Sequence, residues 1–356
     1  MSHDLLLVGS VPLDTAEEVF LACGGALGQH IPYLPDGETD DRIWWVNMLA
    51  YRVFHGHPDI ETVVRPPRAD GVETWKPKDR DEWWAFKVRE GVEEVRFGDP
   101  GWRLGYARDA IHSYFVFRTL REKGLIPAGV RFQVSLPMTN SAIDVFFHDP
   151  ADYDRIKPGF EAAMRAEIAK ILEKIPAEDL AIQWDCCVEV MDLEGSFPWT
   201  PTTGVLERNL APIERLSPHI PEAVALGYHL CYGTLGGWPM VRPKTLATSV
   251  RFANEAVARS GRRVDFIHIP ILDTNDKHYF APLSELDVGD TRIYFGVVHH
   301  QHDQAAFEAR LGTLKRYVAD FGVAAPCGFG RCAPEDVPDL LQDHLRALET
   351  RDRIGP

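Results

Sequence analysis

One continuous apolar segment gives the clearest indication of the fold, and it reads Ala223-Val224-Ala225-Leu226-Gly227-Tyr228-His229-Leu230-Cys231. A short apolar run without regular polar positions is typical of a strand that is buried on both faces of a parallel sheet. His229 and Cys231 are two residues apart, so on an extended strand their side chains point to the same side. The segment therefore predicts a buried strand that presents an imidazole and a thiol together at its end.

Seven further apolar runs alternate with segments of helical spacing. Thr15–Leu27 follows Asp14 as an N-cap, and Tyr153–Ile175 carries one apolar stripe. The eight runs are Leu5–Val11, Ile31–Leu34, Val130–Leu136, Leu180–Asp185, Ala223–Leu230, Val264–Ile269, Arg292–Val298 and Val323–Pro326. Eight buried strands separated by helices predict an α/β fold of one domain, 1–356, built as a (β/α)8 TIM barrel. An open doubly wound sheet is the alternative.

A long segment separates the second run from the third. We expect Ala107–Lys123 within it to be a barrel helix, and 40–105 to be a helical insertion that caps the C-terminal face of the barrel. The insertion is rich in tryptophan, with Trp44, Trp45, Trp75, Trp83, Trp84 and Trp102. These side chains either line a pocket under the cap or pack within the insertion.

Composition limits the partners and the location of the chain. A net charge of -15 disfavours nucleic acid and anionic membrane surfaces, so a small-molecule substrate is expected. The N-terminus lacks the basic flank and the long apolar run of a signal peptide. The six cysteines are too few for a disulfide scaffold in 356 residues, which predicts free thiols in a cytoplasmic protein.

Polar groups follow every predicted strand, on the face where TIM barrels form their active sites. In strand order these are Ser10; Asp36 and Glu38; Asn140; Asp185 and Glu189; His229 and Cys231; His268; His299, His300 and His302; and Cys327. The Pro-Asp-Gly at Asp36 is also favourable turn chemistry.

Two thiols and an imidazole form a soft ligand set that can hold zinc, provided that the fold brings the fifth and eighth strands together. Cys231, Cys327 and His229 are this candidate set, and His268 is either a buried core histidine or a further ligand. A lone thiol on an apolar strand is most often a small buried residue. We interpret the remaining cysteines in that way: Cys23, Cys186, Cys187 and Cys332.

These segments resemble the catalytic barrel of the cobalamin-independent methionine synthase family, which is similar in fold to uroporphyrinogen decarboxylase. His229-Leu230-Cys231-Tyr232 matches the family's His-x-Cys-Tyr zinc motif, and Cys327-Gly328-Phe329-Gly330 resembles the segment with its last thiolate. The resemblance extends, in strand order, to Gly9-Ser10, Gly37-Glu38 with Arg42, Gln183-Trp184-Asp185 and Gly296-Val297-Val298.

The resemblance implies a site and an activity. His229, Cys231 and Cys327 would bind zinc, and His268 would replace the family's glutamate as the fourth ligand. Ser10 would bind a carboxylate, and Glu38 and Asp185 an amine. Beyond the family's motifs, Asn140 is a candidate for binding the donor and Glu189 a further candidate substrate residue. One of His299, His300 and His302, most simply His300, would be the general acid.

The expected function is therefore a zinc-dependent methyl or alkyl transfer from a small-molecule donor to a small thiol. A metal-free decarboxylase or lyase, and a zinc-dependent hydrolase or lyase, are the alternatives.

Overall fold

The computed structural model describes residues 4–66, 83–98, 102–299 and 303–354. Eight strands form one sheet in the order β1-β10-β9-β8-β7-β6-β5-β2, and all neighbouring pairs are parallel. They are β1 (Leu5–Leu6), β2 (Tyr33–Pro35), β5 (Arg131–Pro137), β6 (Leu180–Cys186), β7 (Ala225–Leu230), β8 (Phe266–Pro270), β9 (Arg292–Gly296) and β10 (Gly322–Ala324). Each of the eight predicted runs contains or overlaps one of them.

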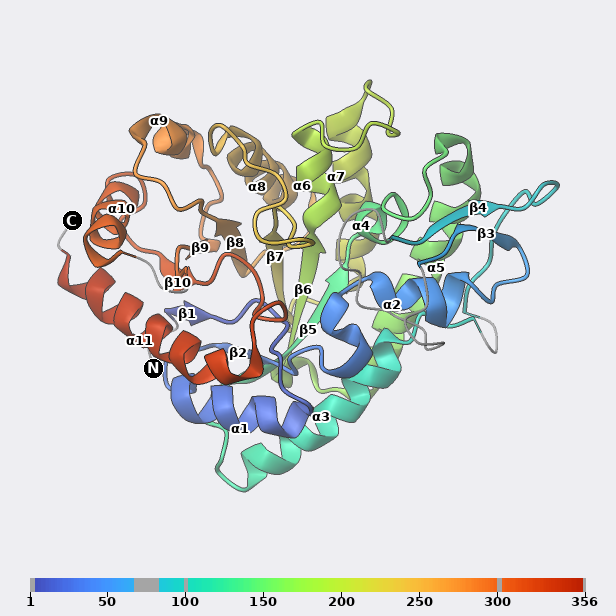
Figure 1. Cartoon of the computed structure of the whole chain (residues 1–356). Coiled ribbons are helices and arrows are strands. Elements are labelled where there is room, and N and C mark those ends of the chain that lie inside the picture. The colour runs from blue at the N-terminus through green and yellow to red at the C-terminus, as the bar shows by residue number, and fades with distance from the viewer. Residues whose placement is uncertain (1–3, 67–82, 99–101, 300–302, 355–356) are drawn as a thin grey trace.

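The sheet curves into a nearly closed barrel (Figure 1). The segments around β1 and β2, the first and last strands of the sheet order, are joined by backbone hydrogen bonds from Leu5 N to His30 O at 3.1 Å and from Val11 N to Gly37 O at 2.9 Å. The predicted TIM barrel is therefore confirmed, and the open doubly wound alternative is wrong.

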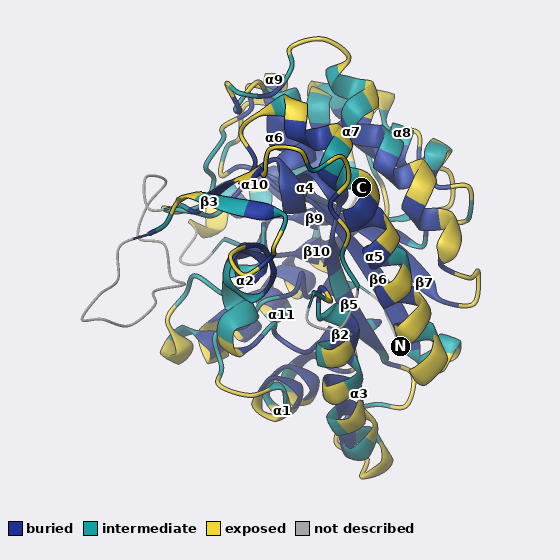
Figure 2. Cartoon of the chain, turned by 90° about the vertical axis from the view of Figure 1, so that its right-hand side faces the viewer, coloured by how far each residue is buried: buried dark blue, intermediate teal, exposed yellow. Residues whose placement is uncertain are grey.

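Helices surround the sheet, with buried inner faces and exposed outer faces (Figure 2). The longer ones are α1 (Ala16–Leu27), α3 (Tyr106–Glu122), α5 (Tyr153–Lys174), α7 (Val205–Leu216), α8 (Ala247–Arg259), α10 (Gln304–Lys315) and α11 (Val337–Arg353). The shorter ones are α2 (Asn47–Leu49), α4 (Thr139–Ile143), α6 (Cys187–Leu193) and α9 (Lys277–Phe280). The N-cap of α1 is Thr15 and not Asp14, because Thr15 and Glu18 exchange the two hydrogen bonds of a capping box.

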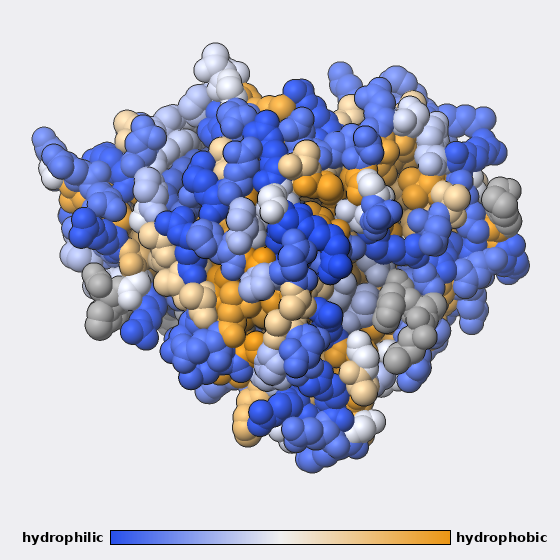
Figure 3. Space-filling view, turned by 180° about the vertical axis from the view of Figure 1, so that it is seen from behind, coloured by the Kyte–Doolittle hydropathy of each residue, from blue (hydrophilic) through white to orange (hydrophobic). Residues whose placement is uncertain are grey.

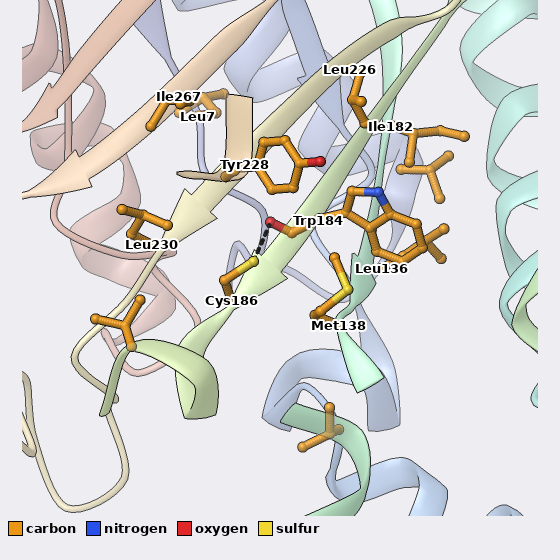
Figure 4. Packing of buried hydrophobic residues seen from close by; sticks show 14 of the residues in the cluster. Leu7, Leu136, Met138, Ile182, Trp184, Cys186, Leu226, Tyr228, Leu230 and Ile267 are labelled. Carbon is orange, nitrogen blue, oxygen red and sulfur yellow. Dashed lines mark hydrogen bonds between the residues drawn. The ribbon is translucent and has the colours of Figure 1, made fainter. Parts of the chain in front are cut away.

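Alternation along the strands separates the apolar core from the polar barrel interior. Trp184 and Cys186 of β6 and Tyr228 of β7 pack with other apolar side chains in the main core (Figure 4). Asp185 follows Trp184 on β6 and His229 follows Tyr228 on β7, so their side chains point to the other face. The two residues are paired in the β6–β7 register and line a cavity. Cys186 is completely buried, as the interpretation of it as a small apolar residue predicts.

The segment after β2 is only partly helical. It contains α2, but also an antiparallel ribbon of β3 (Ile60–Val64) and β4 (Ala85–Val88) that projects from the barrel (Figure 1). Sequence spacing did not predict this ribbon, because its two strands are far apart in the chain and neither is long. The backbone N of Phe86 in the ribbon donates to Phe146 O at 2.9 Å, which ties the insertion to the segment after α4.

The face opposite the view of Figure 1 is mainly polar. Figure 3 shows a face that is mostly hydrophilic, with apolar atoms visible in separate areas. Within the described parts of the chain, no helix has both the length and the apolar character needed to cross a membrane.

Candidate metal centre and active site

A cavity at the carboxyl ends of the strands brings together six of the predicted site residues. Its lining includes Ser10, Glu38, Asp185, His229, Cys231 and Cys327. A wall of aromatic and aliphatic side chains faces this group, with Trp44, Trp45, Trp83, Val145, Phe197 and Met240. The cavity therefore joins a polar floor to an apolar wall, and three tryptophans of the insertion segment form part of that wall.

Three ligand atoms converge on the cavity floor. The Sγ atoms of Cys231 and Cys327 are 3.6 Å apart, and Cys327 Sγ lies 3.8 Å from His229 Nε2. In a tetrahedral zinc site, Zn–S bonds of about 2.3 Å and Zn–N bonds of about 2.0 Å place two sulfurs about 3.8 Å apart and a sulfur and a nitrogen about 3.5 Å apart. The observed spacing agrees with these values to within about 0.3 Å. The residues therefore fit a metal ion.

The thiols lie in surroundings that favour their neutral form. A hydrogen bond with Cys187 and burial raise the pKa of Cys231, while its contact with Cys327 acts to lower it. The pKa of Cys327 is raised by Cys231 and by burial. A dication reverses this balance, because it stabilises coordinated thiolates directly.

His268 lies behind His229 and not among the three converging atoms. Its Nδ1 is 2.8 Å from Nδ1 of His229, and its Nε2 is 2.9 Å from the carbonyl oxygen of Ala325. Burial lowers the pKa of His268 to about 4 and the pKa of His229 well below its usual value, so both rings are neutral. The predicted ligand role of His268 stays a prediction, since both ring nitrogens have protein partners here.

The loop after β2 places a carboxylate in the cavity through an unusual backbone. Among the described residues, the only non-glycine residues with positive φ are Glu38, Asp40 and Trp45, at 47°, 61° and 56°. Gly37 precedes them at φ 79°, where a Cβ would lie 2.6 Å from Val19 Cγ2. Left-handed backbone costs roughly 1–3 kcal/mol per residue, and its concentration beside the cavity is typical of a functional site.

Asp36 and Arg42 hold this loop. Arg42 donates to both carboxylate oxygens of Asp36, and Ser113 Oγ donates to Asp36 Oδ2 at 2.6 Å. Burial acts to raise the pKa of Asp36, but the charge and hydrogen bonds of Arg42 outweigh it and lower the pKa. The backbone N of Glu38 donates to Asp36 Oδ1 at 3.0 Å. Asp36 therefore both forms the turn and holds the backbone of Glu38 in position.

Glu38 and Asp185 both line the cavity and interact electrostatically. Burial raises the pKa of Glu38 to about 7, with Arg42 opposing this and Asp36 adding to it. Burial and the charge of Glu38 raise the pKa of Asp185 well above its usual value, although Gln183 donates a hydrogen bond to its carboxylate at 2.8 Å. Two carboxylates that resist ionisation together favour either a shared proton or a bound cation.

Replacing Glu38 with glutamine should stabilise the metal-free protein relative to wild type. This gain should be larger at neutral pH than at acid pH. A carboxyl whose folded pKa is raised contributes no penalty below its unfolded pKa; the penalty grows as pH rises from there to about 7 and stays constant above it. The variant should gain on the order of 1–3 kcal/mol at about pH 8 and almost nothing at about pH 4. Urea denaturation at both pH values measures this difference, and an equal gain at both would contradict the raised pKa.

The segments after β1 and β10 meet at the site, and two glycines allow their close contact. Phe329 N donates to Ser10 O at 2.6 Å, and Gly330 N donates to Ser10 Oγ at 3.3 Å. A Cβ on Gly328 would lie 2.3 Å from Ser10 Oγ, and one on Gly330 would lie 2.8 Å from it. The Cys-Gly-Phe-Gly segment therefore needs its glycines to let Ser10 pack against its backbone.

Other predicted site residues have contacts away from the cavity. The Asn140 amide donates to Asn209 Oδ1 at 2.8 Å, and the Glu189 carboxylate accepts from the backbone N of Ser141 at 2.9 Å. Neither side chain lines the cavity. His299 Nε2 lies 2.9 Å from Ile271 O, while His300 and His302 fall outside the described residues, so the choice of general acid stays a prediction.

Sequence reasoning missed several cavity residues. Cys187, Met191 and Met240 bring more sulfur to the lining, and Arg331 closes one side with its guanidinium carbon 4.0 Å from the centroid of the Trp44 ring. Arg331 directly follows the Cys-Gly-Phe-Gly segment, and its position after the eighth strand could have marked it as a site residue. Cys187 directly follows β6 and so had the same signal, but we interpreted it as a small buried thiol.

The fold and the site define a TIM-barrel protein with a candidate metal centre. No family model matches the chain, and no curated protein matches it. A Listeria monocytogenes structure, provisionally named a vitamin-B12 independent methionine synthase, is similar with a TM-score of 0.57 at 15% identity, covering 96% of this chain and 87% of that chain. A methyltransferase from Methanosarcina mazei has a TM-score of 0.51 at 11% identity, covering 96% and 94%. At such low identities, these TM-scores show a shared fold alone.

Proposed function

We propose that this protein is a zinc-dependent transferase that moves a methyl or other alkyl group to the sulfur of a small thiol. The observation that carries the proposal is the convergence of His229 Nε2 and the Sγ atoms of Cys231 and Cys327 at zinc-like spacing on the cavity floor. The similar structures from Listeria and Methanosarcina, which carry the names of a methionine synthase and a methyltransferase, support it.

The reaction is a displacement at carbon. Zinc would lower the pKa of the substrate thiol, so that its sulfur is a nucleophilic thiolate at neutral pH. The sulfur forms a bond to the alkyl carbon while the bond from that carbon to the donor atom breaks, and the donor atom keeps the electron pair. A proton from a general acid then neutralises the leaving group, and His300 is our candidate for this acid.

The remaining cavity groups would bind and orient the two substrates. Glu38 and Asp185 fit an ammonium group, because a cation removes their mutual repulsion. Ser10 is the candidate partner of a carboxylate. The wall of Trp44, Trp45 and Trp83 would enclose the alkyl donor and exclude water, which makes the insertion 40–105 the cap of the active site in this proposal.

X-ray absorption at the zinc edge tests this function, with spectra taken before and after addition of homocysteine. We expect the zinc-loaded protein to gain one sulfur neighbour when the thiol is added. A zinc environment unchanged by thiol would contradict thiol activation and favour the hydrolase or lyase that uses water. Turnover that survives complete removal of metal would favour the metal-free decarboxylase or lyase.

A further inference from the structure

We propose that His268 is a positioning residue that fixes His229 in the one neutral tautomer able to bind a metal through Nε2. The idea builds on the metal site of the proposed function. The first test of this idea uses the metal-free protein. The positioning role can therefore be contradicted while the proposed function stands, and the proposed function can be contradicted while the positioning role stands.

With His268 neutral, its contacts to Ala325 O and His229 Nδ1 favour one arrangement of protons, although the backbone of Leu230 also interacts with its ring. The carbonyl oxygen of Ala325 can only accept, so His268 Nε2 at 2.9 Å must carry the proton. A neutral His268 then has a bare Nδ1, which accepts from Nδ1–H of His229 at 2.8 Å. The proton of His229 is thereby held on Nδ1. Its Nε2 keeps a free lone pair, and this atom is the one that faces Cys327 Sγ.

The hydrogen bonds from His229 to His268 and from His268 to Ala325 O form a chain that we call the histidine relay. Its surroundings hold this relay in place. His268 is completely buried and His229 is 3% exposed, so water cannot readily replace either hydrogen bond. Gly296 at the end of β9 provides the space, because a Cβ there would lie 2.7 Å from His268 Nε2 and 2.7 Å from the Cα of Pro326. This glycine lets His268 reach the carbonyl of Ala325, just before the Pro-Cys segment that carries Cys327. The relay thus spans β7, β8 and the end of β10.

A neutral relay has a consequence for the charge of the centre. Metal-bound histidines are often held by a carboxylate, which adds negative charge and raises the basicity of the ligand. Here the partner is a neutral imidazole bonded to a backbone carbonyl. Two thiolates and one neutral imidazole would just balance a divalent ion, and His268 would leave the fourth position to the substrate sulfur. An open position of this kind distinguishes catalytic zinc sites from structural ones.

Nuclear magnetic resonance of the metal-free protein, labelled with nitrogen-15 in its histidines, measures the tautomers directly. We expect His229 to be protonated on Nδ1 and His268 on Nε2, and we expect His268→Gln to leave the His229 signal in place. Glutamine can donate to Ala325 O through its amide nitrogen and accept from His229 through its oxygen. A proton on Nε2 of His229 in the wild-type protein would overturn the proposal.

Metal affinity supplies the second measurement, with zinc titrated against a chromophoric chelator. His268→Leu should weaken zinc binding by about 10- to 100-fold, the usual effect of losing a partner of a ligand histidine, while His268→Gln should stay within about threefold of wild type. His344→Leu is the matched control, because His344 is also buried and its Nε2 accepts from Ala325 N at 3.1 Å, but it lies on α11 outside the cavity.

The control should lose stability and keep its zinc affinity. Equal losses of affinity in His268→Leu and His344→Leu would overturn the positioning role, and so would a loss in His268→Gln as large as that in His268→Leu.

Discussion

Replacing Cys231 or Cys327 with serine will remove stoichiometric zinc from the purified protein and abolish alkyl transfer. Structural zinc sites with four protein ligands contribute about 10–16 kcal/mol, or about 2.5–4 kcal/mol per ligand, which corresponds to an affinity loss of roughly 10²- to 10³-fold for each ligand removed. Serine also cannot supply a soft thiolate at neutral pH. Metal analysis by mass spectrometry, together with a zinc titration, measures the effect.

Cys332→Ser provides the control, since Cys332 is a free, partly exposed thiol that does not line the cavity. It should retain full zinc content. Cys187→Ser is more informative, because Cys187 contacts Cys231 and lines the cavity but is not one of the three converging ligands. We expect it to keep zinc with a small loss of affinity. Full zinc occupancy in both Cys231→Ser and Cys327→Ser would contradict the site.

The barrel could be predicted from sequence because its signals are local. Each buried strand, such as Leu180–Cys186, reads as a short apolar run, and helices such as Tyr153–Lys174 have their own apolar periodicity. The β3–β4 ribbon was missed for the opposite reason. Its pairing joins residues more than 20 positions apart, and Ile60–Val64 carries no turn signal that identifies its partner.

The site was predictable to the extent that it follows from strand ends. Knowing that eight strands form a barrel places Cys231 and Cys327 on one face, and the two-residue spacing puts His229 beside Cys231. The partner of His268 could not be predicted in this way. A histidine on β8 can point at an ion or at a neighbouring ring, and the decision rests on Gly296 and on the Ala325 carbonyl from other strands.

Asp185→Asn should weaken binding of an aminothiol such as homocysteine much more than binding of the same thiol without its amine, 4-mercaptobutanoate. Removing one partner of a buried charge pair costs about 2–5 kcal/mol, or roughly 30- to several thousand-fold in affinity. Asparagine keeps the shape of the side chain, and its oxygen can still accept from Gln183. Calorimetry with both thiols on the zinc-loaded protein measures the ratio of the two affinities.

The pH dependence of this affinity ratio shows whether the site recognises the charge of the amine or only the shape of the ligand. Because the pKa of Glu38 is about 7, wild-type affinity for the aminothiol should fall as pH drops below that value, while affinity for the amine-free thiol should not show this additional loss. Glu189→Gln and Asn140→Ala are matched controls, since both side chains bond protein groups away from the cavity. A selectivity that Asp185→Asn leaves unchanged, or that Glu189→Gln removes, would transfer amine recognition from the Glu38–Asp185 pair to the residues around α4 and α6.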